Sequence, residues 1–246
     1  MSTNSKQEGC RPPAGRQHLG RGAGMNEAPQ KERPIIFSGA MVRALLAGTK
    51  TQTRRVASKA VRHPDLGNLY TPGALVLERE PQHVIERCCP YGRPGDRLWV
   101  REATVRVEDH GYTGPVYVES EDGRACLDGG LAPAPDDCTE VEPYELRIRP
   151  SIHMPRWASR ITLEITGVRV ERLQDISIAD AMAEGVEHAR PTLAGLPPCL
   201  EWRYAYEDLW NDIHGPRAWD ANPWVWVVEF KKLDTAPPTC PENRRF

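Results

Sequence analysis

The hydrophobic pattern is clearest in the last quarter of the chain, where it predicts one helix and one strand. Residues 201–213 carry apolar side chains at i, i+3 and i+4 spacing, among them Trp202 and Tyr206, which is typical of one face of an amphipathic helix. In the segment 224–233, every residue as far as Val228 is apolar, so both faces of a strand are apolar there. A strand with this pattern is buried on both sides, so we expect it at the centre of a sheet.

Near the start of the folded part, the pattern predicts a strand, a helix and a second strand. The residues Pro34–Phe37 are predicted to form a short strand. Ser38 suits the N-cap of a helix that continues to Ala47, and Gly48 suits the position just past its end. Residues 49–56 are rich in threonine and end in valine, which favours a polar strand along a surface or cleft.

The middle of the chain is predicted to be mostly β-structure. Alternating apolar positions mark the longest of its strands, and Gly167 within that strand indicates a bulge. Ser177, followed three residues later by Asp180, predicts a helix start with a capping box, and Gly185 ends this helix. The strands predicted in this region lie at 75–79, 83–87, 98–107, 144–149 and 161–173.

This order of elements predicts the fold class α+β. Many short strands with short helices at their ends favour a small mixed β-barrel with flanking helices. The sequence has no βαβ periodicity and no glycine-rich phosphate-binding motif, so we do not expect a nucleotide-binding fold of that kind.

The chain is predicted to contain one domain, residues 32–233, with appendages at both ends. Residues 1–31 have almost no large apolar side chains and are predicted to be disordered, and Met25 within them is a candidate alternative start. Residues 234–246 are predicted to be a flexible tail. Residues 108–145 carry eleven acidic residues and one basic residue, which predicts a long solvated insertion, or alternatively an acidic lid or docking surface.

Charge and composition narrow the class of protein. The net charge is -2 over 246 residues, so any contact with nucleic acid must come from a local basic patch. No apolar run approaches the roughly 18 residues that a membrane span needs, and we expect a cytoplasmic monomer without membrane contact. The seven cysteines show no paired spacing and are expected to be reduced thiols. No metal or cofactor is expected, because the spacing of His83, Cys88 and Cys89 fits no standard zinc site.

The densest group of candidate functional residues is the stretch 48–55, Gly-Thr-Lys-Thr-Gln-Thr-Arg-Arg. From the residues alone, its three threonines suit an exposed strand. Lys50, Arg54 and Arg55 suit a solvated basic face or a phosphate-binding patch.

This stretch, following a short apolar helix, resembles the G-x-K-T-x-T-x-R signature of ASCH domains. Three further segments are similar to parts of that family: residues 94–98, residues 173–186 and the closing strand 224–233. Together the segments span residues 33–233, and the longer arrangement resembles ASCH-type proteins of phages and prophages. The resemblance implies a PUA-like β-barrel.

Members of this family include small bacterial N4-acetylcytidine amidohydrolases, which use a lysine, a threonine and a glutamate. By resemblance these roles fall on Lys50, Thr53 and Glu184. The implied function is hydrolysis of an acylated cytidine or a related modified nucleoside, so the expected partner is a nucleoside or RNA. A non-catalytic module that binds RNA or a modified base, and a ribonuclease, remain alternatives. The residues expected to bind the substrate or RNA are Thr51, Arg54, Arg55 and Trp157.

The implied chemistry sets conditions on these residues. Thr53 would supply the nucleophilic hydroxyl, and Lys50 acts as a base only if burial and nearby cations lower its pKa. Glu184 would be the general acid, although a surface position near a helix end is the alternative. In a regular strand, Lys50 and Thr53 point to opposite faces, so the backbone must be irregular after Gly48 or the lysine must curl round the edge. Trp157 suits base stacking or, alternatively, the edge of the core.

Overall fold

The computed structural model describes residues 30–107, 114–131, 141–186 and 198–234. The predicted disordered start, including Met25, lies outside these residues up to position 29, and the predicted tail lies outside them from position 235. No helix in the described ranges is both long enough and apolar enough to cross a bilayer.

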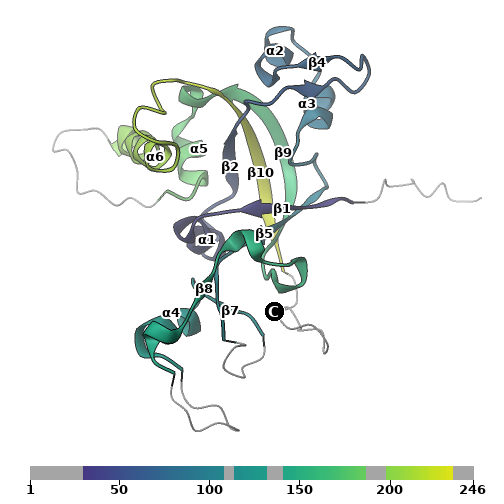
Figure 1. Cartoon of the computed structure of the whole chain (residues 1–246). Helices are drawn as coiled ribbons and strands as arrows, with labels where there is room; N and C mark the ends of the chain where they lie inside the picture. The colour runs from purple at the N-terminus through teal and green to yellow at the C-terminus, as the bar shows by residue number, and fades with distance from the viewer. Residues whose placement is uncertain (1–29, 108–113, 132–140, 187–197, 235–246) are drawn as a thin grey trace, which may run out of the picture.

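The fold is built on a five-stranded mixed sheet with the order β1-β5-β9-β10-β2. Strands β1 and β5 are parallel, and all other neighbours are antiparallel. Strands β9 and β10 are the longest and lie side by side as a curved pair (Figure 1). The strands of this sheet are β1 (Glu32–Ile36), β2 (Gln52–Val56), β5 (Arg97–Arg101), β9 (Thr162–Arg172) and β10 (Trp224–Leu233).

Strand β10 is central and buried on both sides, as its sequence predicts. Trp226, Val228 and Phe230 belong to the main core cluster on the inner face of the sheet. Val225 and Val227 belong to a second cluster on the outer face. The register of β10 against β9 shifts beside Gly167, which confirms the predicted bulge.

The sheet is not closed into a barrel, so that part of the fold prediction is wrong for the described residues, while the α+β class is confirmed. Strands β1 and β2 are the two open edges. A side chain crosses between them: Nη2 of Arg55 on β2 donates a hydrogen bond to the carbonyl oxygen of Ile36, at 2.5 Å. The edges therefore approach each other without a backbone ladder between them.

Two segments predicted as strands, 75–79 and 83–87, are helical instead. They form α2 (Pro72–Leu77) and α3 (Gln82–Cys88), which pack against β9. The hydroxyl of Thr71 caps α2 by accepting from the backbone of Ala74, and Pro72 occupies its first turn, where proline favours a helix. A small ribbon, β3 (Val61–Arg62) and β4 (Leu69–Tyr70), lies beside them in sequence.

The predicted solvated insertion contains ordered structure of its own in its described parts. Helix α4 (Glu121–Gly129) and strand β7 (Val116–Tyr117) lie within it, and β7 joins β6 (Thr104–Val105) and β8 (Ile148–Arg149) in a three-stranded sheet. The strands predicted at 98–107 and 144–149 are correspondingly interrupted. The small apolar cluster of this unit contains Val105, Val107, Leu131, Val141 and Leu146.

Four short 3-10 helices complete the described chain, and two α-helices cover the outer face of β10. Helix α5 (Ile178–Ala183) begins at a capping box formed by Ser177 and Asp180, as predicted. Helix α6 (Pro198–His214) carries Tyr206 and Trp210 into the outer cluster. The 3-10 helices are η2 (Pro143–Glu145), η3 (Ser151–His153), η4 (Arg156–Ala158) and η5 (Leu173–Asp175).

Candidate functional site: a buried lysine–glutamate pair beside β2

The turn after helix α1 (Gly39–Leu46) sets the position of Lys50. Ser38 is the N-cap residue of this helix, and Gly48 follows its end with φ 76°. The backbone N–H groups of Thr49 and Lys50 both donate to the carbonyl of Ala44, at 3.0 and 3.2 Å. Lys50 therefore lies in an irregular segment before the regular part of β2. The sequence requires an irregular backbone here if Lys50 and Thr53 are to share one site.

The end of α5 brings Glu184 to the same place. Glu184 and Lys50 form an isolated antiparallel bridge, and the backbone N–H of Thr51 donates to the carbonyl of Ala183 at 2.8 Å. Gly185 has φ 72°, and a Cβ at this position would lie 2.8 Å from side-chain atoms of both Ala44 and Lys50. Glycine is thus required there by conformation and by space.

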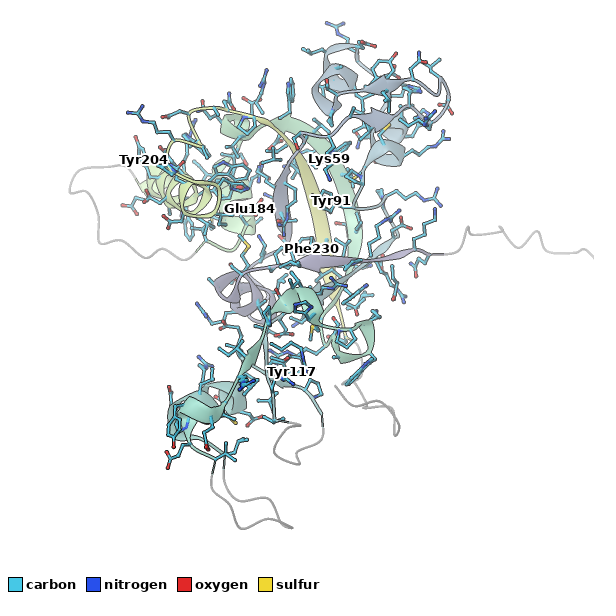
Figure 2. The ribbon with its side chains drawn as sticks, in the orientation of Figure 1. Lys59, Tyr91, Tyr117, Glu184, Tyr204 and Phe230 are labelled. Atoms are coloured by element: carbon cyan, nitrogen blue, oxygen red, sulfur yellow. The ribbon has the colours of Figure 1, made fainter. Side chains whose placement is uncertain are left out.

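Lys50 and Glu184 make a direct, buried ion pair, and Glu184 is labelled in Figure 2. The Nζ of Lys50 donates to the Glu184 carboxylate Oε2 and to the Glu184 carbonyl oxygen, each at 2.8 Å. The side chains are 0% and 2% exposed. Burial is the largest influence on the pKa of Lys50 and lowers it; Glu184 acts in the opposite direction, the charges of Arg55 and Arg54 lower that pKa further, and the net shift is downward.

Strand β2 presents its two arginines to different faces of the sheet. In an antiparallel pair, directly opposed residues point to the same face. Arg54 lies opposite Val227, on the outer face under α5 and α6. Thr53 and Arg55 lie opposite Val228 and Trp226, on the inner face.

On the outer face, Arg54 is enclosed by carboxylates. Its guanidinium lies 2.5 Å from Glu171, 3.2 Å from Glu184 and 3.3 Å from Asp180. Arg169 extends this network through ion pairs with Glu171 and Asp180, each at 2.9 Å. Because the Arg54 side chain is 0% exposed, it holds β2 to β9 and α5 and does not face solvent.

On the inner face, Phe37 lies beneath two cations. The ring centroid of Phe37 is 5.5 Å from Nζ of Lys50 and 5.3 Å from the guanidinium carbon of Arg55. Phe37 also packs against Phe230, with centroids 6.3 Å apart. Thr53 is 2% exposed. The Phe37 ring therefore lies beside an ammonium and a guanidinium, and Thr53 shares this face by its register against β10.

Two predicted binding residues lie apart from this arrangement. Thr51 is exposed, and its backbone carbonyl accepts from the N–H of Phe230 at 2.8 Å. Trp157 is half-buried against the small cluster of Tyr117, Met154 and Ala158. This packing matches the alternative that placed Trp157 at the edge of the core.

Sequence reasoning missed several neighbours of the site. Tyr206 was assigned only to the apolar face of its helix, yet its ring centroid lies 5.9 Å from the guanidinium carbon of Arg54. Burial, followed by the Glu184 charge, raises the pKa of Tyr206 well above the usual tyrosine value. Glu171 was also missed. The available signal was a run of alternating charges within the long β9 strand, where one face must meet a partner of opposite charge.

No protein-family model, curated protein or solved structure matches this chain. The chemistry that the site can perform is therefore inferred from its own side chains. A buried amine with a lowered pKa can accept a proton, and a nearby hydroxyl can act as a nucleophile when a base is within reach.

Proposed function

We propose that this protein is an amidohydrolase that removes an acyl group from the exocyclic nitrogen of cytidine or a related modified nucleoside. The observation that carries the proposal is the 2.8 Å contact between Lys50 and Glu184, which come from segments 134 residues apart. The resemblance to ASCH domains supports it, because residues 48–55 pointed to Lys50 and residues 173–186 pointed to Glu184 from the sequence alone.

The proposed fold is PUA-like, with an open sheet in place of a complete barrel. Its support is the approach of the two edge strands, with Arg55 reaching the carbonyl of Ile36 across the gap. The inner core cluster is enclosed by this curled sheet together with α1, α2 and α3.

In the proposed reaction, Thr53 and Lys50 act together. The neutral amine of Lys50 takes the proton of the Thr53 hydroxyl, whose oxygen forms a bond to the acyl carbonyl carbon. The carbon–nitrogen bond then breaks, and the Lys50 ammonium returns the proton to the leaving nitrogen. Water hydrolyses the acyl–threonine ester in a second step, with Lys50 again as the base.

The role proposed for Glu184 differs from the general acid expected from the sequence. Its two carboxylate oxygens accept from different cations, Lys50 on Oε2 and Arg54 on Oε1. Both oxygens are thus occupied as acceptors of N–H groups. Glu184 is therefore proposed to orient the lysine, and the Lys50 ammonium is proposed to be the acid.

Incubation with N4-acetylcytidine, followed by chromatography, tests the proposal. The wild-type protein is expected to release cytidine, and Lys50→Ala and Thr53→Ala are expected to abolish release. Thr53→Ser keeps the hydroxyl and should retain part of the activity, which separates chemistry from folding. Thr166→Ala is the matched control, because Thr166 is exposed on β9 outside the site. Absence of cytidine from the folded wild-type protein would contradict the proposal.

A binding module without turnover is the second candidate, and the complete burial of the Lys50 side chain favours it. A base must meet its substrate, whereas a purely structural lysine need not. This candidate predicts no cytidine release, together with salt-sensitive RNA binding that falls when Arg55 is replaced.

A further inference from the structure

Two adjacent arginines on β2 have opposite environments. Arg54 is satisfied by the three carboxylates of Glu171, Asp180 and Glu184. Arg55 has no carboxylate within ion-pair distance in the ranges that the structure describes. Its guanidinium hydrogen bond there goes from Nη2 to the Ile36 carbonyl, and its Nε is buried without a partner. A buried donor without an acceptor is costly, so the Nε–H of Arg55 is a donor that a ligand acceptor would satisfy.

We infer that Arg55 binds the N3 and O2 edge of the pyrimidine ring in the proposed substrate, and so selects cytosine-type rings over uracil-type rings. This inference rests on the proposed function and names the specificity determinant of that site. The Nε–H and one Nη–H of a guanidinium are parallel donors that fit two adjacent acceptors. Cytosine presents N3 and O2 as adjacent acceptors, and acylation of N4 leaves both in place.

Uracil breaks this match at one atom. Its N3 carries a hydrogen, so a uracil ring in the same position would direct an N–H group at the guanidinium N–H groups. Two opposed donors in a buried site leave both without an acceptor, which is the strongest basis for rejecting a close analogue.

The position of Arg55 relative to Thr53 suits this assignment. Both side chains point to the inner face, and residues two apart on a strand are about 6.6 Å apart along it. The acyl carbonyl on N4 and the N3/O2 edge belong to the same side of the pyrimidine. One ring can therefore direct its acyl group to Thr53 and its acceptor edge to Arg55.

One aromatic ring borders the guanidinium, and a second packs on the same inner core. Phe37 lies 5.3 Å from the central carbon of the guanidinium. Tyr91 packs against the same inner core cluster (Figure 2); burial raises the pKa of Tyr91, and the charge of Arg55 acts against that rise. The Phe37 ring restricts the orientation of the guanidinium, which a bidentate contact requires.

Calorimetric titration of the full chain with cytidine and with uridine tests the inference. A bidentate contact to the correct base edge discriminates by roughly 5- to 150-fold, and we expect wild-type protein to prefer cytidine within that range. Arg55→Lys keeps the charge but loses the paired donors, so its preference should fall to near unity. Arg172→Lys is the matched control: Arg172 also stacks on an aromatic ring, Trp224 at 4.4 Å, and donates to a carbonyl, that of Asn222. Its preference should stay at the wild-type value.

A ligand change repeats the test without altering the protein. In 3-deazacytidine a C–H replaces N3, so wild-type protein should bind it as weakly as uridine. Equal binding of cytidine, uridine and 3-deazacytidine, or a cytidine preference that survives Arg55→Lys, overturns the inference. Cytidine release from N4-acetylcytidine is measured separately. If the protein releases cytidine but either of these two binding results is found, only the inference about Arg55 is overturned. Absence of both turnover and nucleoside binding defeats the proposed function as well.

Discussion

The Nζ of Lys50 lies 2.8 Å from Oε2 of Glu184, and the same carboxylate accepts from Arg54 at 3.2 Å. Removing the Glu184 carboxylate therefore leaves the buried Lys50 without a carboxylate partner among the described residues, although Arg54 keeps Glu171 and Asp180. Removing Lys50 leaves Glu184 still paired with Arg54. Loss of one partner of a buried pair costs about 3–5 kcal/mol. We expect Glu184→Gln to lower the free energy of unfolding by that amount, and Lys50→Met to lower it by less, in urea denaturation.

An exposed ion pair provides the comparison for this prediction. Arg87 and Asp65 lie 2.9 Å apart with side chains 45% and 54% exposed. Such pairs contribute about 0–1 kcal/mol, so Asp65→Asn should change the unfolding free energy only slightly. If Glu184→Gln costs no more than Asp65→Asn, the buried pair does not stabilise the site as argued.

The central strand gives a second prediction, independent of function. Trp226 is 2% exposed and is among the largest fully buried side chains of the described residues. Trp226→Ala should lower the free energy of unfolding by about 3–5 kcal/mol through lost burial and a cavity. Leu69→Ala, at a side chain 68% exposed, should have almost no effect in the same urea denaturation. Comparable losses in the two variants would show that β10 is not the centre of the core.

The sequence predicted well those elements whose residue pattern has one structural interpretation, such as a strand that is apolar on both faces or a capping box at a helix start. Strand β10 is apolar on both faces and is central, and Ser177 with Asp180 forms the predicted capping box. The segment 83–87 was wrongly predicted as a strand because its β-branched residues favour strands locally. In the fold, Val84, Ile85 and Cys88 share one buried helix face, and tertiary packing outweighs the local preference.

The candidate site was predictable only in part for a different reason. Lys50 and Glu184 were found through the motif resemblance, and their contact depends on Gly185, whose close approach to Lys50 is visible only in three dimensions. The register of β2 against β10 places Arg54 on the outer face, with its carboxylate partners, and Arg55 on the inner face. Sequence spacing alone does not reveal which face has the carboxylates.

Acidic pH should weaken the contacts that Asp96 makes with Lys31 and with Arg33 of β1. Burial raises the pKa of Asp96, but hydrogen bonds from the backbone of Lys31 and Arg93 and from the Arg33 side chain lower it more, to below 3.8. The carboxylate therefore contributes stability that is present above pH 3.8 and lost as the pH falls through the lower, folded value. Asp96→Asn should cost about 1–3 kcal/mol at neutral pH and progressively less below pH 3.8 in urea denaturation. A cost that does not change with pH would contradict this assignment.

Alkaline pH should act on Lys50 with the opposite sign. Its folded pKa is lowered from the usual 10.5, chiefly by burial, so between the lowered value and 10.5 the unfolded chain binds more protons than the folded one. Stability from this group therefore rises with pH across that window and is level on either side. Buried tyrosines such as Tyr206 act in the other direction, because burial raises their pKa, but they are common to wild type and Lys50→Met.

The difference in unfolding free energy between these two proteins, measured by urea denaturation, should move in favour of wild type as the pH approaches 10.5. The kcat/KM for N4-acetylcytidine should rise over the same window, since the neutral amine is the proposed base. A stability difference that stays constant with pH would show that Lys50 titrates normally and would remove it as the base.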